Sequence, residues 1–494
     1  MSNHNGKRAV VIGSGFGGLS VAAFLARDGW NVTVLEKNDL PGGRAQSWEQ
    51  EGFRFDMGPS WYLMPDVFER FFAQFGRASS DYYSLKRLDP SYRIFFAPDD
   101  YIDISSDLSE NLRQFEAMEA GAGDAMRRYL EVAKHEYEVS LNEFVYRDFS
   151  RISDFLNRRT LLEGRKLHVF ENLEKYTARY FSSQRLRKIL EYSMVFLGGS
   201  PQNTPALYSM LAHVDFNLGV WYPSGGIAAV VHGLRALAAE HGAAFQFGRA
   251  ATSIGVRGNR AVSVAAGADE VPADLVVVNA DYAYAETSLL ERRYRTYPER
   301  YWQRRTFAPS AFMMYLGIRK RLPRLQHHTL LFEHDWVEHF NSIFQAPGWP
   351  ERPSYYFCCP SRTDDAVAPP GCENVVALIP VATGLDDPDD VRDAYATRVL
   401  EQIERLTGES LRQNVAVCRV FSQRDFVAEF NAYQGTALGL SHTLMQTALF
   451  RPAHRSKRIA NLYYTGQYTH PGIGLAMALV SSEIVAKRVG GASR

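Results

Sequence analysis

Cysteine is scarce in this chain of 494 residues, and no apolar run is long enough to cross a bilayer. The four cysteines have neither the spacing of a zinc site nor the density of a disulfide-rich secreted domain, so we expect reduced thiols, no metal site and a cytoplasmic location. No segment reaches the ~20 continuous apolar residues of a spanning helix. Lys7 and Arg8 precede only a short apolar run, which predicts a first strand rather than a signal peptide.

An excess of charge of either sign is missing as well. The chain has 55 basic and 55 acidic residues, and this balance gives no indication of nucleic-acid binding. An apolar content of 46% and a charged content of 22% are typical of a folded protein. Because 494 residues are too many for one compact core, we expect two closely joined domains.

The strongest pattern that is present lies near the N-terminus. The apolar run Ala9–Ile12 is followed by a glycine-rich turn, the alanine-rich segment Leu19–Arg27 and a second β-branched run that ends at Glu36. This order predicts the strand, turn, helix and strand of a dinucleotide-binding fold, with the diphosphate at the helix N-terminus and Glu36 on a ribose hydroxyl. NAD and FAD share this half of the molecule, so the pattern alone leaves both open.

Further motifs occur along the whole chain. They are Pro41–Arg44, Asp56–Ser60, Trp221–Gly226, Asn279–Asp281, Phe450–Pro452 and Asn461–Gly472. Their order and spacing resemble those of bacterial-type phytoene desaturases, a family of carotenoid desaturases within the FAD-dependent amine-oxidase-like superfamily. The resemblance implies FAD as the cofactor, with a backbone contact near Ala251 at its adenine end. The binding residues that it implies are Gly13, Gly15, Phe16, Gly17, Gly18, Glu36, Lys37, Gly42, Gly43, Arg44, Gly58, Pro59, Ser60, Ala251, Gly466, His470, Pro471, Gly472 and Ile473.

The expected fold class is α/β, with a Rossmann-like FAD-binding domain, an interleaved α+β substrate domain and a helical, membrane-facing part. We expect the discontinuous FAD-binding domain to comprise residues 1–107, 220–291 and 455–494. Residues 108–219 are expected to form a helical region for substrate and membrane, and residues 292–454 the substrate-binding domain.

A basic segment bears on membrane contact. Residues 147–188 contain eleven basic and five acidic side chains, with apolar residues between them. Such a segment could lie against anionic lipid headgroups or be an ordinary solvated helical face. The resemblance favours the first, and with it peripheral association with the cell membrane.

Long stretches of the chain lack charge. Residues 192–234 contain one Asp, Glu, Lys or Arg, namely Asp215, and residues 430–450 and 459–482 contain none. These stretches could line a pocket for a long hydrocarbon, where an unpaired charge would be costly, or could be ordinary core.

The resemblance implies an FAD-dependent carotenoid desaturase that removes hydrogens from phytoene or a close linear carotenoid, with quinone or oxygen as the electron acceptor. No catalytic residue can be assigned; His213, Asp215 and His470 are candidate proton acceptors only through their nearness to the motifs. One alternative is another flavin oxidase of the amine-oxidase superfamily. The other is a non-catalytic, prenyl-binding protein of the escort type.

Overall fold

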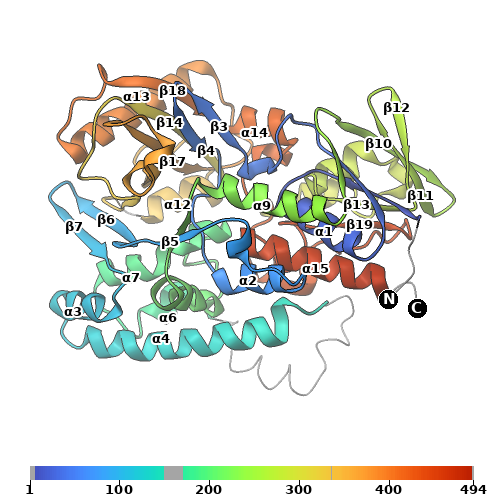
Figure 1. Ribbon diagram of the computed structural model, residues 1–494. Coiled ribbons are helices and arrows are strands. Elements are labelled where there is room, and N and C mark those ends of the chain that lie inside the picture. Colours follow the sequence, from blue (N-terminus) through green and yellow to red (C-terminus); the bar gives the residue numbers. More distant parts are fainter. Residues whose placement is uncertain (1–5, 149–167, 169–170, 335, 492–494) are drawn as a thin grey trace.

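A five-stranded parallel sheet contains the N-terminal strand at its centre (Figure 1). The computed structural model describes residues 6–148, 168, 171–334 and 336–491. The strand order is β19-β13-β1-β2-β9, so segments from both ends and the middle of the chain lie side by side. The strands are β1 (Arg8–Ile12), β2 (Asn31–Leu35), β9 (Ala244–Gln246), β13 (Leu275–Val278) and β19 (Leu462–Tyr464). The expected Rossmann-like α/β architecture is confirmed.

Different layers cover the two faces of this sheet. Val11 of β1 packs among three helices, α1 (Phe16–Arg27), α9 (Ile227–Glu240) and α15 (Leu475–Gly491). Val10 points to the other face and packs in a cluster with a three-stranded antiparallel sheet. The strands of that sheet are β10 (Ala251–Arg257), β11 (Arg260–Ala266) and β12 (Asp269–Pro272). Cover on both faces explains why the central strands are continuous apolar runs.

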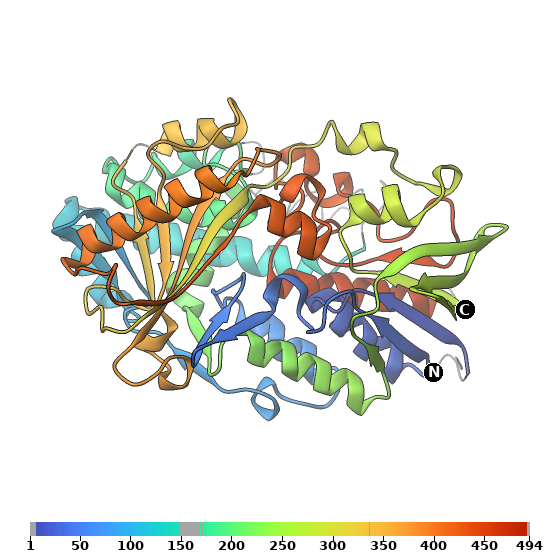
Figure 2. The same ribbon diagram turned by 90° about the horizontal axis from the view of Figure 1, so that it is seen from above.

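A seven-stranded mixed sheet forms the second large layer. Its order is β18-β14-β17-β16-β15-β6-β7, and α13 (Asp389–Thr407) lies across one face (Figure 2). The strands are β6 (Tyr92–Ala97), β7 (Asp100–Ile104), β14 (Ser310–Ile318), β15 (His328–Leu331), β16 (Tyr355–Cys358), β17 (Glu373–Val381) and β18 (Val415–Phe421). Residues 92–104, which the expected division places in the FAD-binding domain, thus add two strands to this sheet. The division into three domains otherwise stays a prediction.

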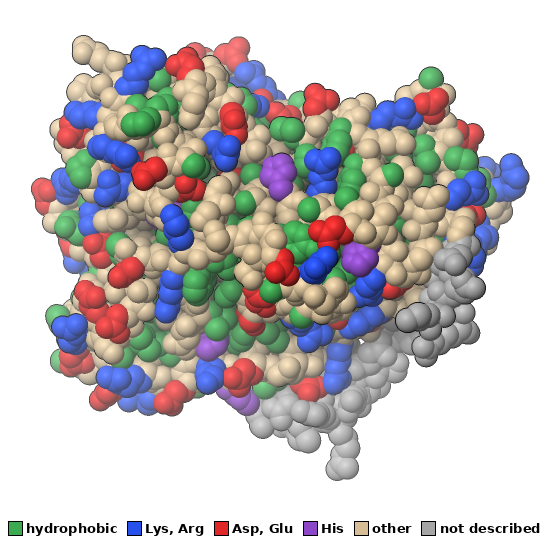
Figure 3. All heavy atoms as spheres, viewed as in Figure 1, with side chains coloured by type: hydrophobic (Ala, Val, Ile, Leu, Met, Phe, Trp, Pro, Cys, Tyr) green, Lys and Arg blue, Asp and Glu red, His purple; other side chains and the backbone are tan. Residues whose placement is uncertain are grey.

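Helices dominate the described part of residues 108–218. They include α3 (Leu108–Met118), α4 (Ala122–Val139), α6 (Leu173–Thr177), α7 (Gln184–Glu191) and α8 (Met210–Ala212), with π-helical turns at Ser140–Val145 and His213–Leu218. Much of the basic segment 147–188 lies outside the described residues. In the described part, no helix combines the length and apolar character needed to cross a bilayer. On the face drawn in Figure 3, basic and acidic side chains are interspersed over the described residues.

One local expectation is wrong. The pattern from Phe53 to Asp107 predicts strands and loops, but Pro65–Ala73 forms helix α2. Proline is favoured in the first turn, where no backbone donor is needed, and Phe68, Phe71 and Phe72 bury one face. The remaining elements are β3 (Ser47–Gln50), β4 (Phe53–Asp56), β5 (Leu85–Arg87), β8 (Trp221–Pro223), α10 (Tyr282–Tyr284), α11 (Glu299–Trp302), α12 (Trp336–Phe344) and α14 (Gln423–Phe430).

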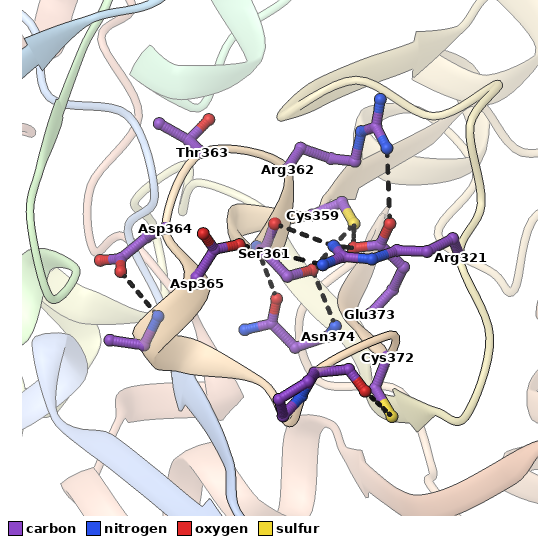
Figure 4. Close-up of polar contacts among 12 residues, drawn as sticks. Arg321, Cys359, Ser361, Arg362, Thr363, Asp364, Asp365, Cys372, Glu373 and Asn374 are labelled. Atoms are coloured by element: carbon purple, nitrogen blue, oxygen red, sulfur yellow. Dashed lines mark hydrogen bonds and ion pairs between the residues drawn. The ribbon is translucent and has the colours of Figure 1, made fainter.

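A polar network anchors the loop between β16 and β17 (Figure 4). Glu373 is fully buried, and its carboxylate accepts hydrogen bonds from the Ser361 hydroxyl and from Arg321 Nη1 at 3.3 Å. Asp364 in the same loop accepts from the backbone N–H of Gly225 at 2.7 Å. The bonds to Glu373 fix the loop on β17, and the bond between Asp364 and Gly225 holds it against the segment between β8 and α9.

Candidate functional site

A single cavity of about 930 Å³ joins the parallel sheet to the seven-stranded sheet. One end lies at the carboxyl ends of β1, β2 and β13, where ligands bind in open α/β sheets. The other end lies between α12 and the strands β14, β15 and β17. Most of the lining side chains are apolar. The predicted residues that line it are Gly13, Gly15, Phe16, Gly17, Glu36, Lys37, Gly42, Gly43, Arg44, Gly58, Pro59, Ser60, Ala251, Gly466, His470, Pro471 and Ile473.

The glycine turn leaves no room for side chains. Gly13 has a φ of +95°, which favours glycine, and a Cβ on Gly17 would lie 2.6 Å from Asn279 Nδ2. A Cβ on Gly15 would lie 2.9 Å from Asn279 Oδ1. Gly18 does not line the cavity; a Cβ there would lie 1.9 Å from the Gly13 carbonyl oxygen, so this residue lets α1 pack closely on the turn. The backbone is therefore exposed as a close-fitting cradle at the N-terminus of α1.

Glu36 lies where β2 ends, with a side chain that is buried. Its Oε2 accepts from the Ser14 backbone N–H and the Ser14 hydroxyl, both at 2.8 Å. Its Oε1 accepts from the Asn38 backbone N–H at 2.9 Å. The carboxylate thus ties the glycine turn to the end of β2 while it stays on the cavity wall. Lys37, also on the wall, donates to the carbonyl of Ala428 in α14.

Arg44 connects the cradle to the middle of the cavity. Its Nη2 lies 3.8 Å from Asp281 Oδ2, and burial raises the pKa of this aspartate. The Arg44 Nε is buried without a hydrogen-bond partner among the described residues. Gly58 packs directly against it, because a Cβ there would lie 2.1 Å from the Arg44 carbonyl oxygen. An unpaired guanidinium N–H at this place fits an acceptor group on a ligand.

The segment before α15 closes the cavity, and the first turn of α15 belongs to the wall. Ile473 donates its backbone N–H to His442 Nε2 at 3.1 Å, and His442 Nδ1 lies 2.6 Å from the Tyr208 hydroxyl. Gly472 lies behind the wall, where a Cβ would be 2.3 Å from His442 Nε2. Burial lowers the pKa of His470 to about 4.

The three candidate proton acceptors lie in different places. Asp215 lines the cavity and is buried, with its carboxylate bonded to two tyrosines. His470 lines it too, but its Nε2 lies 3.2 Å from the Phe144 carbonyl oxygen. His213 does not line it, and its Nδ1 lies 2.7 Å from Asn217 Nδ2. The structure therefore favours Asp215 over His213.

Sequence reasoning missed several residues of the site. Asn279 belongs to the motif Asn279–Asp281 but was not predicted as a binding residue. A Cβ on Gly15, Gly17 or Gly18 would lie within 3.2 Å of its side chain, and its position directly after the buried strand β13 was the signal that could have identified this role. His442 lies in a charge-free stretch without a local motif. The apolar wall formed by Trp336, Phe340 and Ile343 of α12 gives no signal beyond helical periodicity.

One buried group has metal-ligating atoms. A ring nitrogen of His327, a ring nitrogen of His328 and the Cys358 sulfur lie within 4.8 Å of one another. The Nδ1 atoms of the two histidines already lie 2.8 Å from the Thr363 hydroxyl and 2.7 Å from the Tyr356 hydroxyl. Three groups are one fewer than a structural zinc site uses. The expectation of no metal site stays a prediction.

Comparison with known proteins identifies the family. Residues 16–490 match the family of flavin-containing amine oxidoreductases. A carotenoid 3,4-desaturase of Haloarcula japonica is 48% identical, and the match covers 99% of each chain. A zeta-carotene-forming phytoene desaturase of Myxococcus xanthus is 35% identical over 98% of this chain and 94% of its own. The chain belongs to the flavin-containing amine oxidoreductase family, and the carotenoid desaturases are its relatives.

Solved structures agree on the fold. An oxidoreductase from Methanosarcina mazei superposes with a TM-score of 0.64 at 16% identity, covering 97% of this chain and all of the other. A putrescine oxidase superposes with a TM-score of 0.63 at 11% identity, over 98% of this chain and 99% of its own. At such identities the likeness concerns the fold alone.

The cofactor of the family fits the residues that are present. The cradle is lined by Gly13, Gly15 and Gly17, where a Cβ on Gly17 would collide with Asn279, the buried Arg44 Nε has no partner among the described residues, and the N-terminal ends of two helices border the cavity. These features suit a long ligand with a diphosphate and a ring rich in acceptors. FAD is the cofactor of this chain, as expected from the sequence.

Proposed function

We propose that this protein is an FAD-dependent carotenoid desaturase that acts on phytoene or another linear carotenoid. The observation that carries the proposal is the continuity of the cavity, which runs from the glycine cradle into an apolar space between α12 and the seven-stranded sheet. The names of the two relatives, a carotenoid 3,4-desaturase and a phytoene desaturase, support the same substrate class. An amine oxidase would need polar groups for an amine, which this lining mostly lacks.

We propose that the predicted residues bind successive parts of FAD along the cavity. The Gly13–Gly18 turn would take the diphosphate, and Glu36 a ribose hydroxyl. The ring would lie near Gly42–Arg44, Gly58–Ser60 and the segment from Gly466 to Ile473. The exposed backbone of the cradle and the unpaired Arg44 Nε support this assignment.

The residues at the other end of the cavity would bind the hydrocarbon through apolar surface that binding removes from water. A hydrocarbon has no polar handle, so affinity depends on surface removed from water, about 25 cal/mol per Å². Trp336, Phe340 and Ile343 on α12 would hold one side of the polyene and fix which bond lies at the flavin. Bound FAD supplies a two-electron acceptor for hydride.

Pigment produced in cells tests this function. Bacteria that accumulate phytoene, or a more desaturated linear carotene, would express the chain, and their extracted pigment would be compared with that of an empty vector. We expect new long-wavelength bands, whose position counts the double bonds added. A yellow, FAD-containing protein that changed none of these carotenes would contradict the proposal, and oxidation of an amine by it would favour the other oxidase.

We propose that the enzyme meets its substrate at a membrane surface through the segment from Thr443 to Phe450. Leu444, Met445 and Phe450 are 38%, 61% and 44% exposed, whereas Thr447 and Ala448 line the cavity. An exposed apolar cluster next to the cavity suits a protein that takes a hydrocarbon from lipid. The association would be peripheral, on the cytoplasmic face.

Sedimentation with liposomes tests the membrane contact. We expect Met445→Glu with Phe450→Glu to reduce sedimentation strongly. The matched control is Val262→Glu, an equally apolar and 36% exposed residue on β11, far along the chain from this segment. Equal sedimentation of all three proteins would contradict the assignment.

We also propose quinone or oxygen as the final electron acceptor. Because a lipid-soluble quinone would share the membrane with the substrate, it agrees with the surface proposed above. Anaerobic turnover with added quinone, compared with turnover in air without it, distinguishes the two acceptors.

A further inference from the structure

Asp215 is an acid in an unusual place. It is the sole Asp, Glu, Lys or Arg in residues 192–234, and it lies in the π-helical turn His213–Leu218. Turns of this kind within helices are rare and occur frequently at functional sites. Asp215 is 8% exposed and lines the cavity. A carboxyl group at such a place needs an explanation, since its ionised form is costly to bury.

The surroundings of Asp215 hold one carboxylate oxygen and leave the other without a partner. Oδ2 accepts from the Tyr92 hydroxyl at 2.6 Å and from the Tyr192 hydroxyl at 3.1 Å. Oδ1 is buried and has no hydrogen-bond partner among the described residues. Neither does a described Lys or Arg form an ion pair with it, and burial raises its pKa to about 7. The group can therefore exchange a proton near neutral pH, whereas the raised pKa values of both tyrosines keep them as donors.

Aromatic contacts connect this carboxyl group to the proposed flavin side of the cavity. The ring of Trp61 lies 5.6 Å from that of Tyr92 and 6.0 Å from that of Tyr192, between centroids. Trp61 directly follows Ser60, and both line the cavity. The two tyrosines that orient Asp215 thus pack on the residue next to the Gly58–Ser60 segment.

The proposed reaction requires a base. Desaturation breaks two C–H bonds on neighbouring carbons: one hydrogen leaves as hydride with its electron pair, and the other leaves as a proton. The electrons of the second bond become the new π bond. Bound FAD would supply the two-electron oxidant for the hydride, and the proton needs an acceptor within reach of an apolar substrate.

We propose that the Asp215 carboxylate is this acceptor and that its Oδ1 takes the proton from the substrate carbon. The inference rests on the proposed desaturase function. The negative charge of the Asp215 carboxylate also stabilises the positive charge that develops on the substrate carbon when hydride leaves. The proton afterwards passes to water, which restores the carboxylate, and the two electrons leave with the quinone or oxygen proposed above.

Glu191 provides a matched control within the same region. It is also buried, its pKa is also raised by burial to about 7, and it accepts a hydrogen bond from the Thr177 hydroxyl. It does not line the cavity. A loss that came merely from removing a buried carboxylate would therefore affect Glu191→Gln as much as Asp215→Asn.

The test compares the FAD-loaded wild type, Asp215→Asn, Asp215→Glu and Glu191→Gln. We expect Asp215→Asn to lower turnover of a linear carotenoid by about 100-fold or more, with unchanged FAD content and unchanged substrate binding, measured from the shift of the carotenoid absorption. Asp215→Glu should recover part of the rate, and Glu191→Gln should resemble the wild type. The rate of the wild type should rise with pH to a plateau, with an apparent pKa near 7; Tyr92 and Tyr192 are the described titratable groups that face Asp215.

A readout independent of turnover accompanies this comparison. Infrared difference spectra between pH 5 and pH 8 should contain protonated-carboxyl bands in the wild type, and one component of them, that of Asp215, should be missing in Asp215→Asn and present in Glu191→Gln. Turnover of Asp215→Asn within threefold of the wild type, or absence of that component, would overturn the inference. If the wild type desaturated no linear carotenoid, the proposed function would fail instead, before any variant was compared.

Discussion

The two ends of the cavity are built in different ways. The cradle is formed by backbone and by glycines within a few turns of β1, and a Cβ on Gly17 would collide with Asn279. The other end is formed by apolar side chains from elements that lie far apart in the sequence, such as Tyr192 and Ile343. A diphosphate is recognised by fixed N–H groups, whereas a hydrocarbon is recognised by area, to which any apolar side chain of the right size contributes.

The largest effect should come from a change at the cradle. Gly15→Val would place a branched side chain where a Cβ alone would lie 2.9 Å from Asn279 Oδ1, so backbone and diphosphate could not approach. We expect FAD affinity to fall at least ~100-fold, about 2.7 kcal/mol, as measured by the flavin absorbance retained after gel filtration.

Gly490→Val is the control for this change, because a Cβ at Gly490 would have no neighbour within 4 Å. This variant should retain FAD as the wild type does. Full FAD occupancy in Gly15→Val would mean that the diphosphate lies elsewhere, and the contrast between the two ends of the cavity would lose its basis.

A charge at the apolar end should weaken carotenoid binding and leave FAD binding unchanged, the reverse of the change at the cradle. Ile343→Glu places a carboxylate without a partner on the wall formed by α12, which opposes hydrocarbon binding by an amount on the order of 2–3 kcal/mol. We expect carotenoid binding to weaken about 30-fold to 150-fold while FAD content stays unchanged. The measurement is titration of the FAD-loaded protein with substrate.

Val337→Glu on the same helix is the matched control, since Val337 is 49% exposed and does not line the cavity. Its carotenoid affinity should equal that of the wild type. Equal weakening in both variants would indicate damage to α12 rather than a charge in the binding site.

The same contrast explains what the sequence could predict. The cradle was predicted because each glycine has a geometric reason to be glycine, and Glu36 follows at a distance that the fold determines. Asn279 packs against glycines that are far away in the sequence, and His442 accepts a hydrogen bond from Ile473. These two roles could be predicted only once the pairing of β1 with β13 and the path of the chain were known. For the apolar end, the charge-free stretches predicted the composition, but they could not give the place of Ile343.

The pH dependence of stability at Asp215 is the smallest of these effects, and it tests whether the apolar end of the cavity extends to this residue. Burial raises its pKa to about 7 in the folded protein, whereas an unfolded aspartate titrates near ~3.9. The folded state therefore binds more protons than the unfolded state between these values, so the contribution of Asp215 to stability is present at low pH and is lost as pH rises toward 7. Asparagine does not titrate, so the stability of Asp215→Asn relative to the wild type should increase by on the order of 2 kcal/mol from pH 5 to pH 8. Thermal unfolding of both proteins at the two pH values measures this difference; an identical difference at both would mean that Asp215 is already ionised at pH 5, as a water-exposed carboxylate would be, and that the apolar end of the cavity does not extend to it.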